Sequence, residues 1–257
     1  MTQKTLEDIE ILCVDDGSTD DSLEILKHYS EIDERITVIK QNNQFAGVAR
    51  NNGFSVVEGD YVLFLDSDDW FDHSMIQKML SKIVETDSDI VVCKSKRYDD
   101  KDKVYTKLAS GLKENLIDLD KSYSPIDIKE VLFQVTAGWP WDKIYKTSFI
   151  RDKHIEFQNT RIANDARFVY VAYAEANRIS FVSEELVVHR SNVENSLEFT
   201  RHKFWECGIQ MAYAFKDELV VRNKYDLYKG SYVRCMQDYL MWMLRNLPNF
   251  ELFSRMY

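Results

Sequence analysis

Strand-like and helix-like segments alternate along the first hundred residues, and this alternation constrains the fold more than any other feature of the sequence. Short apolar runs occur at 11–14, 36–39, 61–65 and 90–93. Between them, apolar residues recur at helical spacing in three segments, at 23–29, 47–57 and 75–84. Strands that alternate with helices predict an α/β fold with a mostly parallel sheet and helices on both of its faces.

The pattern changes beyond residue 95. We expect a hairpin at 98–108, helices at 126–135 and 165–176, and short strands at 179–182 and 186–189. From residue 197 onward, apolar residues at helical spacing predict long helices. The sequence therefore predicts two parts, an α/β domain over 1–196 and a helical C-terminal extension over 197–257.

Composition and charge exclude several classes of protein. Hydrophobic residues make up 45% of the 257 residues, which is enough for a buried core. The 43 acidic and 33 basic residues give a net charge of −10, which would repel a phosphate backbone, so we expect no nucleic-acid partner. No apolar stretch approaches the ~18–20 residues of a membrane span, and Met1 begins no signal peptide, so we expect a cytoplasmic protein.

Acidic residues follow two of the apolar runs directly. Asp15 and Asp16 come after the first run, and Asp66-Ser67-Asp68-Asp69 comes after the third. In a parallel α/β sheet such loops meet at the carboxyl ends of the strands, where ligands bind. Carboxylates gathered in one crevice repel one another unless a cation lies among them, which favours a divalent metal. The alternative is that these residues only cap the following helices.

The segment Asp66-Ser67-Asp68 has the D-x-D form that can hold Mg²⁺ or Mn²⁺ against a diphosphate. A single intervening residue in an extended segment lets both carboxylates point into the same crevice. A metal on a diphosphate would stabilise the charge on a leaving nucleoside diphosphate. Glycosyl transfer from a nucleotide sugar needs this electrostatic help.

Three motifs in the first 69 residues resemble those of family 2 glycosyltransferases, a group with the GT-A fold that builds bacterial surface polysaccharides. They read Ile-Leu-Cys-Val-Asp-Asp-Gly-Ser-Thr-Asp over 11–20, Gly-x-Ala-Arg-Asn-x-Gly over 47–53, and Gly-Asp-Tyr-Val-x-Phe-Leu-Asp-Ser-Asp-Asp over 59–69. The segments at 141–145 and 165–168 extend the resemblance to about residue 196. We find no counterpart in the family for 197–257.

The resemblance assigns most charged residues of these motifs to a nucleotide sugar. It implies that Asp16 contacts the base, that Asp66 lies on the ribose side, and that Asp68 ligates Mg²⁺ or Mn²⁺. The full set of implied nucleotide-sugar contacts is Asp15, Asp16, Arg50, Asn51, Asp66 and Ser67. For Arg50, an ion pair at the surface is the alternative.

Asp165 falls where the family places its catalytic base, at the start of a helix. There it would take the proton from an acceptor hydroxyl as that oxygen attacks the anomeric carbon, with inversion. The family usually has Glu immediately before this Asp, whereas this sequence has Asn164. The alternative is that Asp165 is only the N-cap of its helix.

Four further residues resemble acceptor or diphosphate contacts, namely Trp141, Lys143, His189 and Arg190. Trp141 would offer an aromatic face to a sugar, or else serve as a core residue. Either His189 or Arg190 would reach the diphosphate or the metal. For His189 the alternative is a hydrogen-bonded histidine at a strand end.

The start of the sequence differs from the family pattern. Family members begin with an apolar strand that ends in Pro-x-Tyr-Asn and then a helix, whereas residues 1–6 resemble only the tail of that helix. Because the strand pairs in the middle of the sheet, its absence is expected to leave unpaired backbone or a new exposed edge. A misassigned start codon, a truncated gene and another segment that fills the place are all open explanations. If the short form is genuine, we expect weak or absent nucleotide-sugar turnover.

These observations predict an inverting glycosyltransferase that uses a nucleotide sugar, with UDP favoured by family habit, and a saccharide or lipid-linked acceptor. The main alternative is an inactive or partner-dependent GT-A module that acts as a binding protein. A metal-dependent phosphatase is disfavoured because Trp70 stands where such enzymes want Thr or Val, and a receiver domain would not explain the chain beyond residue 130. The slightly basic segment 197–257 would contact the inner face of the plasma membrane or pair two copies of the chain.

Overall fold

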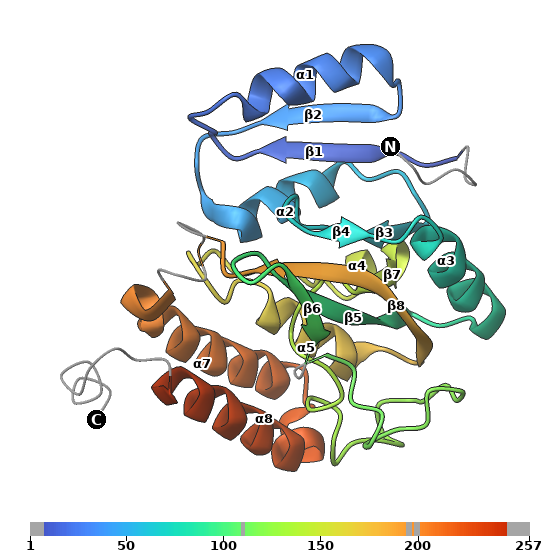
Figure 1. The fold of residues 1–257 in the computed structure, drawn as a ribbon. Coiled ribbons are helices and arrows are strands. Elements are labelled where there is room, and N and C mark those ends of the chain that lie inside the picture. Colours follow the sequence, from blue (N-terminus) through green and yellow to red (C-terminus); the bar gives the residue numbers. More distant parts are fainter. Residues whose placement is uncertain (1–7, 109–110, 194–196, 198–200, 246–257) are drawn as a thin grey trace.

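The structure is a computed structural model of the chain, and it describes residues 8–108, 111–193, 197 and 201–245. The helix tail expected at 1–6 lies outside these residues. The described part has two sheets with helices around them and two long helices near its C-terminal end (Figure 1). No helix in this part is both long and apolar enough to cross a membrane.

The first sheet consists of two parallel strands, β1 (Ile11–Asp15) and β2 (Ile36–Lys40), connected through α1 (Ser22–Ile32). β1 is the apolar run predicted at 11–14. Beyond its end, Gly17 has φ +76°, a left-handed conformation that side chains with a Cβ rarely adopt. This turn ends the strand and leaves the acidic pair that follows it at the carboxyl edge of the sheet.

The second sheet is mixed. Its strands run in the order β3 (Tyr61–Leu63), β7 (Lys143–Lys146), β5 (Ile90–Asp99), β8 (Ile179–Ser191) and β4 (Trp70–Phe71), and β6 (Val104–Lys107) pairs with β5. In this sheet only β5 and β8 pair in parallel, whereas the expectation was a mostly parallel sheet. One reason is that β5 and β6 form the predicted hairpin, and strands joined by a tight turn run antiparallel.

β8 is one strand of 13 residues where two short strands were expected. The polar residues 183–185 that separate the two apolar runs are exposed. The register between β8 and β5 shifts opposite Cys93–Ser95, and this irregularity accommodates the extra residues. The strand therefore continues without a break to His189 and Arg190.

The helices α2 (Phe45–Ser55), α3 (Met75–Thr86), α4 (Thr147–Asp152) and α5 (Ala166–Glu175) flank the second sheet and its loops. The helix expected at 126–135 is wrong, because this segment forms successive turns. Most of its apolar side chains are buried, although Ile126 is 55% exposed, and two of its polar groups bond to α8 (Tyr225–Arg245). The Phe133 N–H donates to Ser231 Oγ at 2.9 Å, and Gln134 Nε2 donates to the Ser231 carbonyl at 2.6 Å.

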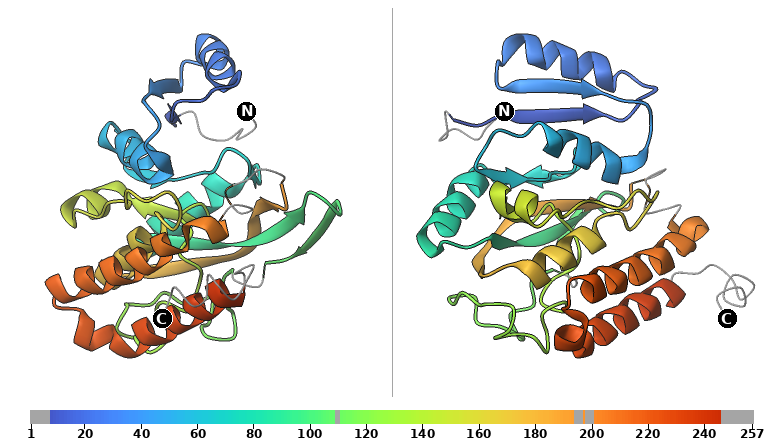
Figure 2. Two further views of the ribbon diagram at one scale, coloured as in Figure 1. Left: turned by 90° about the vertical axis from the view of Figure 1, so that its left-hand side faces the viewer. Right: turned by 180° about the vertical axis from the view of Figure 1, so that it is seen from behind.

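The C-terminal helices α7 (Trp205–Val221) and α8 (Tyr225–Arg245) follow a short 3₁₀ turn at Arg201–Phe204. α7 packs against α5, and α8 lies beside α7 (Figure 2). Buried side chains of both helices belong to the same core cluster as Phe133 and the side chains of α5. The domain boundary at 196/197 stays a prediction.

The two sheets are not joined by a ladder in the described part of the chain, and a cleft of about 2560 Å³ separates β1 from β3. The Ile11 N–H donates to Arg35 O, and Asp15 O accepts from the Gln41 N–H, both on the β2 side. Because backbone groups alternate in direction along a parallel strand, those of Leu12 and Val14 face the cleft instead. This interruption agrees with the expected unpaired edge.

Candidate active site

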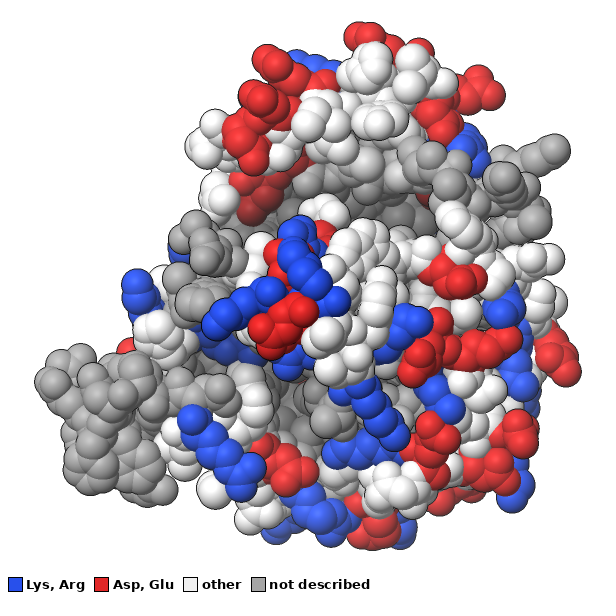
Figure 3. Space-filling view, viewed as in Figure 1, with Lys and Arg blue, Asp and Glu red and all other residues white. Residues whose placement is uncertain are grey.

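Most of the predicted site residues line the cleft between the two sheets. A space-filling view shows a hollow beneath the layer formed by β1, β2 and α1 (Figure 3). The predicted residues that line it are Asp15, Asp16, Arg50, Asp66, Ser67, Asp68, Trp141, Asp165, His189 and Arg190. Asn51 and Lys143 are not among its lining residues.

The acidic pair after β1 is held from the β2 side of the cleft. Asp15 is 3% exposed, its Oδ1 accepts from the Ser18 N–H at 3.2 Å, and its Oδ2 has no partner among the described residues. Asp16 Oδ1 accepts from Gln41 Nε2 at 2.7 Å and from the Gln44 N–H at 2.8 Å. A buried carboxylate oxygen without a donor is costly, so Asp15 suits a ligand that brings one.

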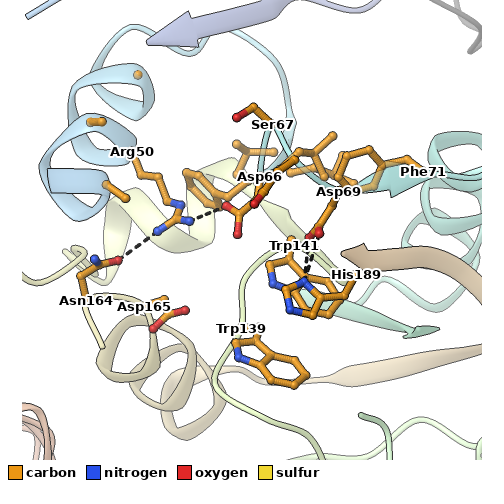
Figure 4. A pocket seen from close by; sticks show the side chains of 18 of the residues that line it. Arg50, Asp66, Ser67, Asp69, Phe71, Trp139, Trp141, Asn164, Asp165 and His189 are labelled. Atoms are coloured by element: carbon orange, nitrogen blue, oxygen red, sulfur yellow. Dashed lines mark hydrogen bonds and ion pairs between the residues drawn. The ribbon is translucent and has the colours of Figure 1, made fainter. Parts of the chain in front are cut away.

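Arg50 connects both sides of the cleft. From α2 its Nη2 lies 2.5 Å from Asp66 Oδ1, and its Nη1 donates to Asn164 Oδ1 at 3.0 Å (Figure 4). The Arg50 side chain is 16% exposed and that of Asp66 is 31% exposed, so Arg50 forms an ion pair at the wall of the cleft, and its contact with a nucleotide stays a prediction. Asn164 Nδ2 in turn donates to the Thr160 carbonyl at 3.2 Å, which fixes the amide.

Asp165 precedes α5 at its N-cap position, yet its side chain makes no capping hydrogen bond within the described structure. Its carboxylate points into the same space as the Asp66 and Arg50 side chains (Figure 4). Burial raises the pKa of Asp165, and the Arg50 charge opposes part of this rise. A carboxylate with a raised pKa that is not used for capping has the properties of a general base.

A close backbone approach brings α2 to the loop before Asp165. A Cβ on Gly47 would lie 2.2 Å from the Gln158 carbonyl oxygen and 3.0 Å from Asn164 Cβ. Only a residue without a side chain lets the helix sit this near. The glycine of the 47–53 motif therefore places Arg50 within reach of Asn164.

The loop after β3 is attached to the end of β8 through Asp69. The Asp69 side chain is fully buried, and its Oδ1 lies 3.0 Å from His189 Nδ1 and accepts from the Arg190 N–H at 2.9 Å. The sequence motif assigned no role to this residue. The only signal was its position directly after the D-x-D segment.

The three carboxyl groups of this loop determine how it would hold a cation. Partial burial and the neighbouring charges of Asp69 and Asp66 raise the pKa of Asp68, so a cation would relieve this repulsion. Among the described residues, no three His, Cys, Asp or Glu side chains form a ready metal centre. Mg²⁺ commonly binds through one or two carboxylates plus substrate phosphates, so the loop fits a metal that arrives with a diphosphate.

Two predicted contacts are corrected by their positions. The Asn51 side chain forms two hydrogen bonds with the backbone of Phe157, donating to its carbonyl at 3.0 Å and accepting from its N–H at 2.9 Å. Asn51 therefore orders the loop before α5. Lys143 is wholly buried, with Nζ 2.5 Å from Asp142 Oδ1 and 2.7 Å from the Trp139 carbonyl. A buried ammonium that is already paired does not reach a diphosphate in the cleft.

Trp141 supports a histidine instead of offering a free face. Its side chain is 2% exposed, and its ring stacks on Trp139 at 5.0 Å and on His189 at 5.3 Å between centroids. The platform for a sugar is therefore corrected to a core role. His189 is held by Asp69 at one ring nitrogen and by this stack across its face, as Figure 4 shows.

The mixed α/β fold, the acidic loops after β1 and β3, and the aspartate before α5 are the features of a GT-A protein. The family model described as Glycosyl transferase family 2 matches residues 1–156, more than half of the chain, and the chain belongs to this family.

Two bacterial relatives and one solved structure illustrate the similarity. Glycosyltransferase GlyG of Streptococcus pneumoniae is 30% identical over 73% of this chain and 63% of its own length. The poly(ribitol-phosphate) beta-glucosyltransferase of Bacillus spizizenii is 34% identical over 68% of this chain and 26% of its own length. The crystal structure of Staphylococcus aureus TarS 1–349 in complex with UDP-GlcNAc has a TM-score of 0.64 at 24% identity, covering 86% of this chain and 62% of that one. The chain thus spans less than two thirds of the length of each.

Proposed function

We propose that the chain catalyses inverting transfer of a sugar from a nucleoside diphosphate donor to a saccharide or lipid-linked acceptor in surface polysaccharide synthesis. The proposal rests mainly on the Asp165 carboxylate, which faces the cleft beside the Arg50–Asp66 pair and makes no capping hydrogen bond within the described structure. The names of the relatives, a poly(ribitol-phosphate) glucosyltransferase among them, support a surface glycan as the product class. UDP is the favoured nucleotide because TarS structures were solved with UDP-GlcNAc and with UDP.

The donor would bind between the two acidic loops. Asp15 and Asp16 would accept hydrogen bonds from the base, and Asp66 and Ser67 would contact the ribose side. Arg50 would approach the diphosphate with a guanidinium that already spans the cleft. These assignments follow the positions of the side chains around one cavity.

Asp165 would accept the proton of the acceptor hydroxyl while that oxygen attacks the anomeric carbon, opposite the departing diphosphate. Its raised pKa keeps the carboxylate basic enough for this task. Asp68, with Asp66 beside it, would hold Mg²⁺ or Mn²⁺. When bound, such an ion supplies positive charge that offsets the charge on the leaving diphosphate.

The test combines turnover with binding. Wild type and Asp165→Asn are incubated with UDP-sugars, Mn²⁺ and oligosaccharide acceptors, and released UDP is measured together with the shift of Tm that UDP causes. We expect the variant to lose about 10²–10⁴-fold in turnover and to keep the shift. Asp120→Asn, an exposed aspartate far along the chain, is the matched control and should behave as wild type. Turnover by Asp165→Asn near the wild-type rate would show that another group is the base.

Within the described part of the chain, no ladder joins β1 to β3, and this favours a second candidate, a GT-A module that works only with a partner or as a binding protein. Absence of any UDP-dependent rise in Tm in wild type would support it over the enzyme. A cytoplasmic location with peripheral contact to an anionic membrane, and a homodimer through the C-terminal helices, stay predictions. Salt-sensitive binding to liposomes with anionic lipid, and the mass in solution, would test them.

A further inference from the structure

Three aromatic side chains form a row on the surface beside the cleft, and we call Trp70, Tyr98 and Tyr105 the aromatic strip. The ring centroids of Trp70 and Tyr98 lie 5.1 Å apart, and those of Tyr98 and Tyr105 lie 5.0 Å apart. They come from β4, β5 and β6. Tyr98 lies directly opposite Tyr105 across the ladder, so the strip runs across the strands of the sheet.

The two ends of the aromatic strip are open to solvent. Trp70 is 46% exposed and Tyr105 is 63% exposed. Cross-strand aromatic pairs stabilise sheets, but a purely structural pair gains most when its rings are buried. A contiguous exposed row of large apolar rings is instead typical of a binding surface.

The strip begins at the candidate active site. Trp70 follows Asp69, the residue that holds His189, and it lines the cleft. The Arg190 guanidinium carbon lies 6.0 Å from the Trp70 ring centroid, and Arg190 also lines the cleft. Tyr98 and Tyr105 lie beyond the lining residues. The strip thus leads from the reacting end of the cleft out over the hairpin of β5 and β6.

Several charged groups beside the strip form ion pairs. Arg190 Nε lies 2.9 Å from Asp100 Oδ1, and Lys96 Nζ lies 3.8 Å from Glu185 Oε2. Figure 3 shows basic and acidic side chains intermingled over this hairpin. The surface of this hairpin is nevertheless slightly basic, because residues 96–107 carry five Lys and Arg side chains and three Asp side chains. It offers aromatic faces for apolar contact and paired polar groups for hydrogen bonds with hydroxyls.

We propose that the aromatic strip binds the acceptor as an extended glycan. The glycan extends along the exposed surfaces of the three rings, which are tilted to one another by 77° and 55°, and its hydroxyl groups bond to Arg190 and Asp100. The terminal sugar is thereby directed into the cleft. The inference rests on the proposed function, since it names the acceptor class of that same site.

The test measures glycan binding by the full chain without turnover. Chitohexaose, cellohexaose, maltohexaose and a β-1,3-glucan hexamer are titrated by calorimetry into wild type, Tyr105→Thr, Trp70→Ala and Tyr213→Ala. Threonine removes the ring but keeps a strong strand preference, so the hairpin is retained. Tyr213 is 66% exposed on α7 and matches Tyr105 in exposure. We expect at least one hexamer to bind wild type and Tyr213→Ala equally, and the two strip variants at least tenfold more weakly.

The inference is overturned if no hexamer binds at 10 mM (roughly the weak end of specific binding), or if Tyr105→Thr binds as wild type does. It is also overturned if the strip variants lose binding to anionic liposomes and no hexamer binds, which would make the strip a membrane contact. The Tm shift with UDP is measured in the same samples. Glycan binding without a Tm shift would count against the proposed donor site alone. A Tm shift with UDP but without glycan binding would count against the strip alone.

Discussion

At the residue scale, Arg50 is the side chain that links several polar groups of the cleft. Arg50 is shared between Asp66 and Asn164, and its charge acts on Asp165. Asn164 accepts a hydrogen bond from Arg50 without adding a negative charge, whereas the Glu usual in the family would add one beside Asp165. The neutral amide leaves the guanidinium more able to favour the charged form of Asp165.

The raised pKa of Asp165 makes a prediction about stability. Between its ordinary value of 3.8 and the raised value, the folded protein binds more protons than the unfolded chain, so stability falls as the pH rises through this window. At neutral pH the buried charge therefore costs stability, and Asp165→Asn removes that cost. We expect the variant to have the larger free energy of unfolding in urea at pH 7, with the difference narrowing toward pH 4. Equal stability at pH 7 would contradict the burial argument.

Asp69 makes a second prediction at this scale. Asp69→Ala leaves His189 Nδ1 and the Arg190 N–H without their buried partner. We expect a loss of about 2 kcal/mol or more in the free energy of unfolding, measured by urea denaturation. Asp102→Ala, at the exposed turn of the β5–β6 hairpin, should change it by less than about 0.5 kcal/mol. Similar values for the two variants would refute the anchoring role.

At the scale of elements, the site depends on how closely α2 and β8 approach the loops around them. α2 reaches the loop before α5 because Gly47 has no Cβ, and β8 reaches the loop after β3 because a register irregularity carries it past its exposed polar residues. Both features change the position of the backbone. The side chains of Arg50 and His189 are placed as a consequence.

Substitutions at two helical glycines distinguish the close packing of α2 from the general effect of glycine on helix propensity. Gly47→Ala puts a Cβ 2.2 Å from a carbonyl oxygen, so α2 must shift, and we expect a loss of about 1–3 kcal/mol and weaker UDP binding. At Gly230 in α8 the nearest atoms lie 3.5 Å away or farther, so Gly230→Ala should be neutral or stabilise by up to about 1 kcal/mol. Urea denaturation and the Tm shift with UDP measure both, and a neutral Gly47→Ala would disprove the close approach.

At the scale of the whole molecule, the C-terminal helices belong to the same core as the second sheet. Phe215 of α7 is fully buried, and its ring centroid lies 4.9 Å from that of Phe133 and 5.2 Å from that of Tyr170. The β1–β2–α1 layer, by contrast, faces the remainder across a wide cleft. The C-terminal helices are therefore packed into the core, whereas the β1–β2–α1 layer is separated from the core by the cleft.

This arrangement predicts a single unfolding unit that includes α7 and α8. Phe215→Ala should lower the stability by about 3–5 kcal/mol and move one cooperative transition of the circular dichroism signal. Val221→Ala, at a position 78% exposed, should leave it within about 0.5 kcal/mol. Two transitions, of which Phe215→Ala moves only one, would instead support 197–257 as a separate domain.

The sequence by itself determined the local features of this protein. The order of strands and helices in the first hundred residues (apart from the short strand β4), the acidic loops at strand ends and the family motifs all depend on neighbours along the chain, so spacing and residue type sufficed to predict them. The tertiary structure alone decided the pairing directions in the second sheet, the turns at 126–135, the burial of Trp141 and Lys143, and the anchor at Asp69. These depend on contacts between residues far apart in the chain. A buried lysine with an ion-pair partner and an exposed lysine that binds a diphosphate cannot be distinguished in a sequence, because packing alone determines which of them is accessible to solvent.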